Sequence, residues 1–168
     1  KARKLEVEYV YLPSEKIADF PYNQVDVEVW DMIPSLKKVE PAEGMTVVEA
    51  MPQVQFVDSD RAGWYRIILD GECKIEAADE DGAYYAKVTL DNLKRNAGGN
   101  QLPNLVIEDW PDFGYRGFML DISRNFTTKD NILKFIDLLA HYKASVFHLH
   151  FGDDEGWRLE IEKFPELT

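Results

Sequence analysis

The sequence predicts two structural units, an α+β domain over residues 1–111 and a parallel α/β unit that begins at residue 112. In the first part, alternating apolar residues and a tight-turn dipeptide predict an antiparallel sheet with a helix beside it. In the second part, two nearly continuous apolar segments flank a helix, which is typical of parallel strands buried on both faces. Pro111-Asp112-Phe113-Gly114 marks the boundary, because proline and glycine interrupt both patterns.

Three segments supply the predicted sheet of the α+β domain. Residues 25–30 place three valines on one face, which predicts a half-buried strand. Residues 64–69 and 73–77 flank Asp70-Gly71, a dipeptide that favours the positive φ angles of a hairpin turn. These two segments are therefore predicted to pair as a hairpin.

One helix and one short strand follow the hairpin. Apolar residues at spacings of three and four (Ala83, Ala86, Leu90 and Leu93) predict a helix from about Asp79 to Arg95. The stretch 96–100 contains Gly98-Gly99 and ends that helix. Residues 102–104 then lead into a short strand predicted over residues 105–108.

The second unit is predicted as strand 117–122, helix 129–143 and strand 144–150. Thr127 or Thr128 is available as the N-cap of the helix. A strand-helix-strand unit of this kind implies a right-handed parallel crossover. Ligands bind at the carboxyl ends of strands in parallel α/β folds, so the residues that follow each strand are the ones to inspect.

The composition is that of a globular protein and excludes several function classes. The 168 residues are 45% hydrophobic and 30% charged, and the net charge of −12 disfavours nucleic acid and anionic membrane as partners. No apolar run is long enough for a membrane span, and Lys1-Ala2-Arg3-Lys4 is not followed by an apolar signal segment. The single cysteine, Cys73, cannot form an internal disulfide.

Polar residues follow both predicted parallel strands. Arg124 comes after the first, and Asp153 and Asp154 come after the second. Neighbouring strands would bring the guanidinium and the carboxylates to one pocket, where fixed donors beside charged acceptors suit the hydroxyls of a sugar. The alternative is a structural ion pair. The adjacent aspartates favour a site, because like charges repel unless a ligand, a cation or a shared proton relieves them.

Other residues in the same region have two interpretations each. His148 and His150 share one strand face and suit half of a metal site, although packed histidines are the commoner case. Trp157 is either a stacking surface for a sugar or a core anchor. Asp79-Glu80 and Asp154-Glu155 resemble the acidic pair of a glycosidase, but the first suits a helix N-cap and the members of the second are expected to point in different directions.

Two long motifs resemble the opening of the catalytic barrel of glycoside hydrolase family 20, the β-N-acetylhexosaminidases. They are YRGFMLDISRNF over residues 115–126 and FHLHFGDDEGWRLEI over residues 147–161. Residues 1–111 resemble more loosely the non-catalytic α+β domain that precedes this barrel. Asn125 stands where the family commonly has histidine, and Phe151-Gly152 stands where leucine and threonine or serine are common.

The resemblance implies that residues 112–168 are the truncated start of a (β/α)8 TIM barrel. It implies an exo-acting enzyme that removes terminal N-acetylhexosamine from a glycan or chitooligosaccharide, with retention and with the substrate's acetamido oxygen as nucleophile. Arg124 and the Asp153-Asp154 pair match sugar-binding positions of the family, and His150 and Trp157 are further candidates. The catalytic Asp-Glu pair is expected beyond Thr168, so the isolated chain is expected to be inactive.

The resemblance implies no cofactor and no metal, and it implies a periplasmic, extracellular or lysosomal location. Two alternatives remain open at this stage. One is a non-enzymatic carbohydrate-binding or interaction module, and the other is a metal-dependent hydrolase that uses His148 and His150. The open parallel edge and apolar surface of strands 117–122 and 144–150 also predict self-association.

Overall fold

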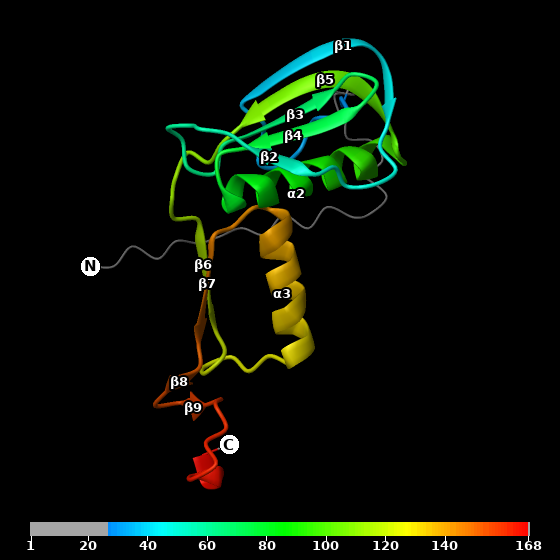
Figure 1. Cartoon of the computed structure of the whole chain (residues 1–168). Coiled ribbons are helices and arrows are strands. Elements are labelled where there is room, and N and C mark those ends of the chain that lie inside the picture. The colour runs from blue at the N-terminus through cyan, green and yellow to red at the C-terminus, as the bar shows by residue number, and fades with distance from the viewer. Residues whose placement is uncertain (1–26, 168) are drawn as a thin grey trace, which may run out of the picture.

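The structure is a computed structural model that describes residues 27–167. It contains a five-stranded sheet backed by helix α2, and a parallel two-stranded unit with helix α3 extends away from it (Figure 1). The small hairpin of β8 and β9 lies at the far end of that unit from the sheet. Within the described part, no helix is long and apolar enough to cross a membrane.

The five-stranded sheet has the order β1-β5-β3-β4-β2. Its strands are β1 (Lys38–Val47), β2 (Val54–Phe56), β3 (Tyr65–Leu69), β4 (Cys73–Ala77) and β5 (Gln101–Asp109). Helix α2 (Glu80–Ala97) packs on one face, and the buried side chains of β3 alternate with half-buried ones. Apolar side chains of the sheet and of α2, such as Ile67, Ile107 and Leu90, form the core between them, and all three are fully buried.

The predicted hairpin and helix of this domain are confirmed. Strands β3 and β4 pair antiparallel around Gly71, which has φ 70°. Helix α2 begins after Asp79, whose Oδ1 accepts a hydrogen bond from the Gly82 N–H at 2.8 Å. It ends at Gly98, which adopts the left-handed conformation with φ 69°. The helix is two residues longer than predicted at its C-terminus.

The rest of the sheet differs from the prediction. Strands β1 and β2 were not predicted, and β2 pairs parallel with β4, so the sheet is mixed and not wholly antiparallel. Strand β5 begins at Gln101 and not at residue 105. It tolerates Pro103 because its pairing with β3 ends at Leu105, so the missing N–H of Pro103 removes no bond to β3.

The strand predicted over residues 25–30 is wrong in the part that can be described. Residues 25 and 26 lie outside the described residues, and residues 27–30 form coil and a turn. The Asp31 carboxylate accepts a hydrogen bond from the Glu28 N–H at 2.9 Å, and the Asp31 N–H donates to the Glu28 carbonyl at 2.9 Å. This reciprocal pair closes the turn, and Val29 and Trp30 pack on the edge of the core.

The parallel unit has the predicted order of elements. Strand β6 (Gly117–Asp121), helix α3 (Lys129–His141) and strand β7 (Val146–His150) follow one another, and β6 and β7 pair in parallel. Thr128 is the N-cap of α3. The expectation that both strands are buried on both faces is wrong, because no residue of either strand is fully buried and none of α3 is.

Two basic residues of the parallel unit hold it against the five-stranded sheet and helix α2. The Lys143 Nζ lies 2.8 Å from the Tyr65 Oη and 3.1 Å from the Asp109 Oδ2, and the Lys143 side chain is only 7% exposed. Arg116 donates to the Tyr85 Oη at 2.6 Å and to the Lys143 carbonyl at 2.9 Å. Both residues lie at the amino ends of β6 and β7, so the carboxyl ends of these strands lie at the other end of the unit.

Candidate functional site

The candidate site forms where β6 and β7 end. Asp121 is the last residue of β6, and its Oδ1 accepts hydrogen bonds from the Ser123 and Arg124 N–H groups, each at 3.0 Å. Its Oδ2 accepts from the Arg124 Nη1 at 2.8 Å. The short loop after β6 is therefore folded around one carboxylate, and this loop carries Arg124 to the strand end.

Arg124 and Asp153 meet across the two strands, as predicted. Asp153 lies in β8 (Gly152–Asp153), which pairs with β9 (Gly156–Trp157) in a tight hairpin after β7. The Arg124 Nη2 donates a short hydrogen bond to the Asp153 Oδ2, and the Arg124 Nε lies 3.5 Å from a Glu155 oxygen. The His150 Nε2 lies 2.9 Å from the same Asp153 Oδ2.

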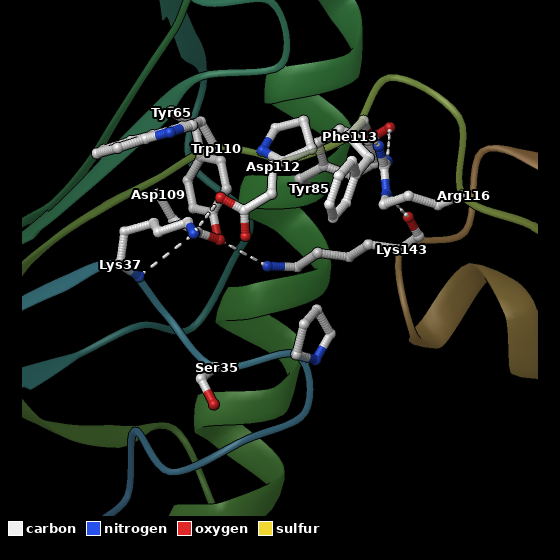
Figure 2. Close-up of a pocket in the computed structure, with 12 residues that line it drawn as sticks. Ser35, Lys37, Tyr65, Tyr85, Asp109, Trp110, Asp112, Phe113, Arg116 and Lys143 are labelled. Carbon is white, nitrogen blue, oxygen red and sulfur yellow. Dashed lines mark hydrogen bonds and ion pairs between the residues drawn. The ribbon is translucent and has the colours of Figure 1, made fainter.

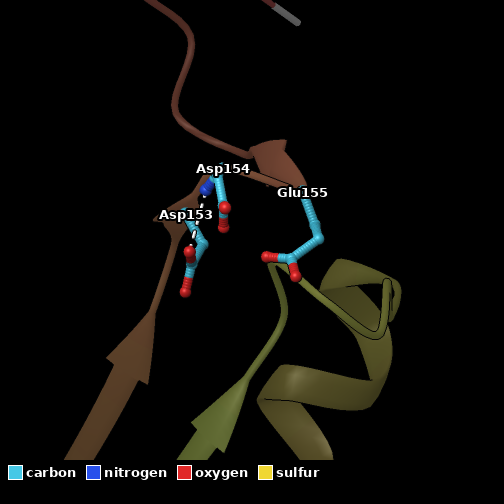
Figure 3. A group of neighbouring side chains, drawn as sticks. All are labelled: Asp153, Asp154 and Glu155. Atoms are coloured by element: carbon cyan, nitrogen blue, oxygen red, sulfur yellow. Dashed lines mark hydrogen bonds between the residues drawn. The ribbon is translucent and has the colours of Figure 1, made fainter.

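The three consecutive acidic residues converge at the tip of the β8-β9 hairpin (Figure 3). One oxygen from each of Asp153, Asp154 and Glu155 lies within 4.8 Å of the others. The expectation that Asp154 and Glu155 point in different directions is therefore wrong. The tight turn between β8 and β9 brings their carboxylates together, and the guanidinium of Arg124 lies against two members of the group.

The electrostatics of the adjacent aspartates are unequal. Hydrogen bonds from Asp154, and then from His150, hold the pKa of Asp153 well below its usual range. The pKa of Asp154 is raised, mainly because its side chain shares a hydrogen bond with Asp153 and another with Glu155. The carboxylate of Asp153 also raises the pKa of Arg124. Asp153 is thus a fixed anion, whereas Asp154 takes up a proton more readily.

His150 and Trp157, the two further candidates from the sequence, differ in how they contact this site. His150 belongs to it through its contact with Asp153. Trp157 is 37% exposed, and its Nε1 donates to the Leu159 carbonyl at 2.5 Å. Its ring lies against Gly152, where an added Cβ would come within 2.7 Å of it. Trp157 therefore supports the hairpin with one part of its ring and exposes another.

His148 is exposed and has its place in β7 two residues before His150. Among residues 27–167, no third histidine, cysteine or carboxylate completes a ligand set with these two histidines. The acidic trio is the one such group in that range, and it includes neither. The geometry therefore does not favour the metal hydrolase that uses His148 and His150.

Ser123 and Arg158 were not singled out from the sequence, although they hold the site together. Arg158 donates from its Nε to the Ile122 carbonyl at 3.0 Å and from its Nη2 to the Ser123 carbonyl at 2.9 Å. The buried Ser123 Oγ donates to the Gly156 carbonyl at 2.5 Å. Both residues fall inside the two motifs, and that position was the available signal.

The other acidic pair has a structural position. Asp79 caps α2 through Oδ1, and its Oδ2 accepts from the Gly63 N–H at 2.9 Å. Glu80 is the first residue of the helix. This supports the prediction that Asp79-Glu80 is an N-cap and not a catalytic pair.

Two family models match consecutive parts of the chain. The model for glycosyl hydrolase family 20, domain 2, matches residues 34–110. The model for the catalytic domain of the same family matches residues 113–168. Together they account for most of the sequence and meet in the connection between β5 and β6.

Curated relatives give the same result. The N,N'-diacetylchitobiase of Vibrio harveyi is 46% identical over 109 residues, which are 64% of this chain and 12% of that protein. A β-hexosaminidase of Vibrio furnissii is 44% identical over 108 residues, which are 63% of this chain and 18% of that protein. The matched segment thus spans less than a fifth of the length of these relatives.

A solved structure has the same fold. The family 20 exo-β-N-acetylglucosaminidase of Vibrio harveyi in complex with N-acetylglucosamine superposes with a TM-score of 0.70 and 27% identity. The match covers 84% of this chain and 28% of that one. The chain therefore belongs to glycoside hydrolase family 20, and it carries domain 2 and a part of the catalytic domain.

Proposed function

We propose that this chain is part of an exo-β-N-acetylhexosaminidase and that Arg124, Asp153 and Asp154 form one wall of the pocket for the terminal sugar. The observation that carries the proposal is the meeting of Arg124 and Asp153 at the carboxyl ends of β6 and β7. Ligands bind at this end of the strands in parallel α/β folds. The names of the relatives support the choice of an N-acetylhexosamine-terminated glycan as substrate.

The wall suits a sugar because it offers both kinds of hydrogen-bonding group. The side chain of Arg124 is 54% exposed, and a guanidinium has five N–H donors, of which the neighbouring carboxylates engage only some. Asp154 is exposed and offers acceptor oxygens beside it. Sugar hydroxyls donate and accept, so one hydroxyl can bridge the two side chains. His150 fixes Asp153, and Trp157 is the candidate for the rim.

The proposed reaction is hydrolysis with retention, in which the substrate's acetamido oxygen is the nucleophile. In this proposal a glutamate protonates the leaving oxygen, and an aspartate orients the acetamido group. Asp79 is engaged as a helix cap, and Glu155 lies 3.5 Å from the Arg124 Nε. We therefore propose substrate binding, and not proton transfer, as the role of Arg124, Asp153 and Asp154. A periplasmic, extracellular or lysosomal location is part of the same proposal.

An assay on the isolated chain tests the division of roles. We expect no hydrolysis of p-nitrophenyl N-acetyl-β-glucosaminide above the rate of a variant with Arg124→Ala and Asp154→Ala. Turnover that the double substitution removes would contradict the assignment, because the chain would then contain a working acid.

A titration with N-acetylglucosamine separates this proposal from a free-standing carbohydrate-binding module. We expect no measurable binding to the isolated chain, because one wall cannot offset the entropy lost when the sugar is held. Saturable binding that depends on Arg124 would instead favour the binding module.

A further inference from the structure

A cavity lies at the opposite end of β6 and β7 from the candidate site. It opens where the sheet meets the parallel unit, and Figure 2 shows the side chains that line it. The volume of the cavity is about 120 Å³. Small-molecule sites occur preferentially at domain junctions. Its walls include four aromatic residues, namely Tyr65, Tyr85, Trp110 and Phe113.

The ammonium of Lys143 reaches this cavity with an unused donor. Two of its hydrogen bonds go to the Tyr65 Oη and the Asp109 Oδ2. An ammonium has three N–H groups, and the third has no acceptor among residues 27–167. The Lys143 side chain is only 7% exposed and lines the cavity, so a ligand inside the cavity can offer an acceptor for this donor.

The charges that line the cavity favour an anion. Lys37, Arg116 and Lys143 supply three cations, whereas Asp109 and Asp112 supply two carboxylates, so one positive charge is in excess. The Lys37 Nζ lies 2.5 Å from the Asp112 Oδ1, and the Lys37 side chain is partly exposed. Hydrogen bonds between ionised partners are the strong ones. A ligand with one carboxylate would therefore balance the charge and accept the free N–H.

We propose that this cavity binds a small molecule that has an apolar or aromatic ring and one carboxylate. The carboxylate accepts a hydrogen bond from the Lys143 Nζ, and the ring lies among the aromatic walls. This site is separate from the sugar wall at Arg124, and it does not depend on the proposed glycosidase activity.

An NMR titration of the 168-residue chain with benzoate tests the proposal, followed at the Trp110 indole N–H and the Phe113 amide. We expect saturable shifts with one site. Benzamide has nearly the same shape without the charge, and we expect it to bind about tenfold more weakly or worse, since a charge-assisted hydrogen bond is lost. Equal binding of both probes, or no saturable shift with benzoate, would overturn the proposal.

Variants separate the cavity from non-specific binding. Ser35 lines the cavity and is exposed, so Ser35→Trp should block benzoate without touching the buried ion pair. Lys143→Met combined with Asp109→Asn leaves no unpaired buried charge, and it should remove the preference for benzoate over benzamide. Arg124→Ala and Lys129→Met should leave the titration unchanged, because both side chains lie outside the cavity. Benzoate shifts that persist in Ser35→Trp would contradict the site, as would their loss in Arg124→Ala.

Discussion

The two ends of the β6-α3-β7 unit hold their charged groups differently. At the amino ends of the strands, Lys143 and Asp109 are 7% and 9% exposed, and both contact the hydroxyl of Tyr65. At the carboxyl ends, Arg124 is 54% exposed and lies among carboxylates. A buried pair is costly to break, whereas an exposed one contributes little to stability and stays accessible. The comparison indicates that one end anchors the unit to the sheet and the other is open to a ligand.

The largest expected effect concerns the buried end. Lys143→Ala leaves the Asp109 charge buried without its cation, and we expect it to lower the free energy of unfolding by about 3–5 kcal/mol in urea titrations. The exposed Lys129 on α3 is the matched control, and Lys129→Ala should stay within about 0.5 kcal/mol of the wild type.

A double variant tests the cause of that loss. In Lys143→Met with Asp109→Asn no unpaired charge is left, so we expect it to recover a large part of the lost stability. A Lys143→Ala effect no larger than that of Lys129→Ala would show that the junction is not an anchor, and the contrast between the two ends would fail.

The second prediction concerns the surface between the two ends. Several large apolar side chains of β6 and α3 are 42–55% exposed, namely Phe118, Met119, Leu133, Ile136 and Leu138. We expect the isolated chain to self-associate in light scattering, because exposed apolar patches of this kind promote contact. Leu133→Glu with Leu138→Glu should reduce the association, whereas the exposed polar control Lys134→Glu should not. A monomeric wild-type chain would contradict this prediction.

The third prediction uses pH to examine the exposed end. The pKa of Asp153 is lower in the folded chain than the value of about 3.9 usual for an unfolded one, so the folded state binds fewer protons there. Its contribution to stability is therefore present above about pH 4 and is lost as the pH falls further. Asp153→Asn should lower the urea midpoint at pH 6, and the difference from the wild type should shrink by pH 3. A difference that stays constant with pH would contradict the assigned ionisation.

The elements with local signals could be predicted from the sequence. The hairpin followed from Asp70-Gly71, and α2 followed from its apolar spacing and the cap at Asp79. Strand β1 was missed because Pro41 and Gly44 interrupt its alternation, which an edge strand tolerates. The strand predicted over residues 25–30 is wrong at residues 27–30 because the turn there depends on a hydrogen bond that the Asp31 carboxylate accepts from the Glu28 N–H.

Part of the candidate site could also be predicted from the sequence. Arg124 and Asp153 follow consecutive strands, so topology alone brought them together. The Lys143-Asp109-Tyr65 contacts join residues 34 and 78 positions apart, and no local pattern reports such a contact. A tyrosine on the buried face of β3 was the one available hint, because a buried hydroxyl needs a partner.

The most direct test of the proposed sugar wall is the substitution Arg124→Ala. It is also the substitution with the smallest expected effect on stability. In the proposed hexosaminidase of which this chain is a part, Arg124→Ala should lower kcat/KM for p-nitrophenyl N-acetyl-β-glucosaminide roughly 10- to 100-fold, as expected for lost hydrogen bonds to a charged group. The urea midpoint should hardly change, because the side chain is exposed. A kcat/KM within twofold of the wild type would contradict the assignment of Arg124 to the sugar.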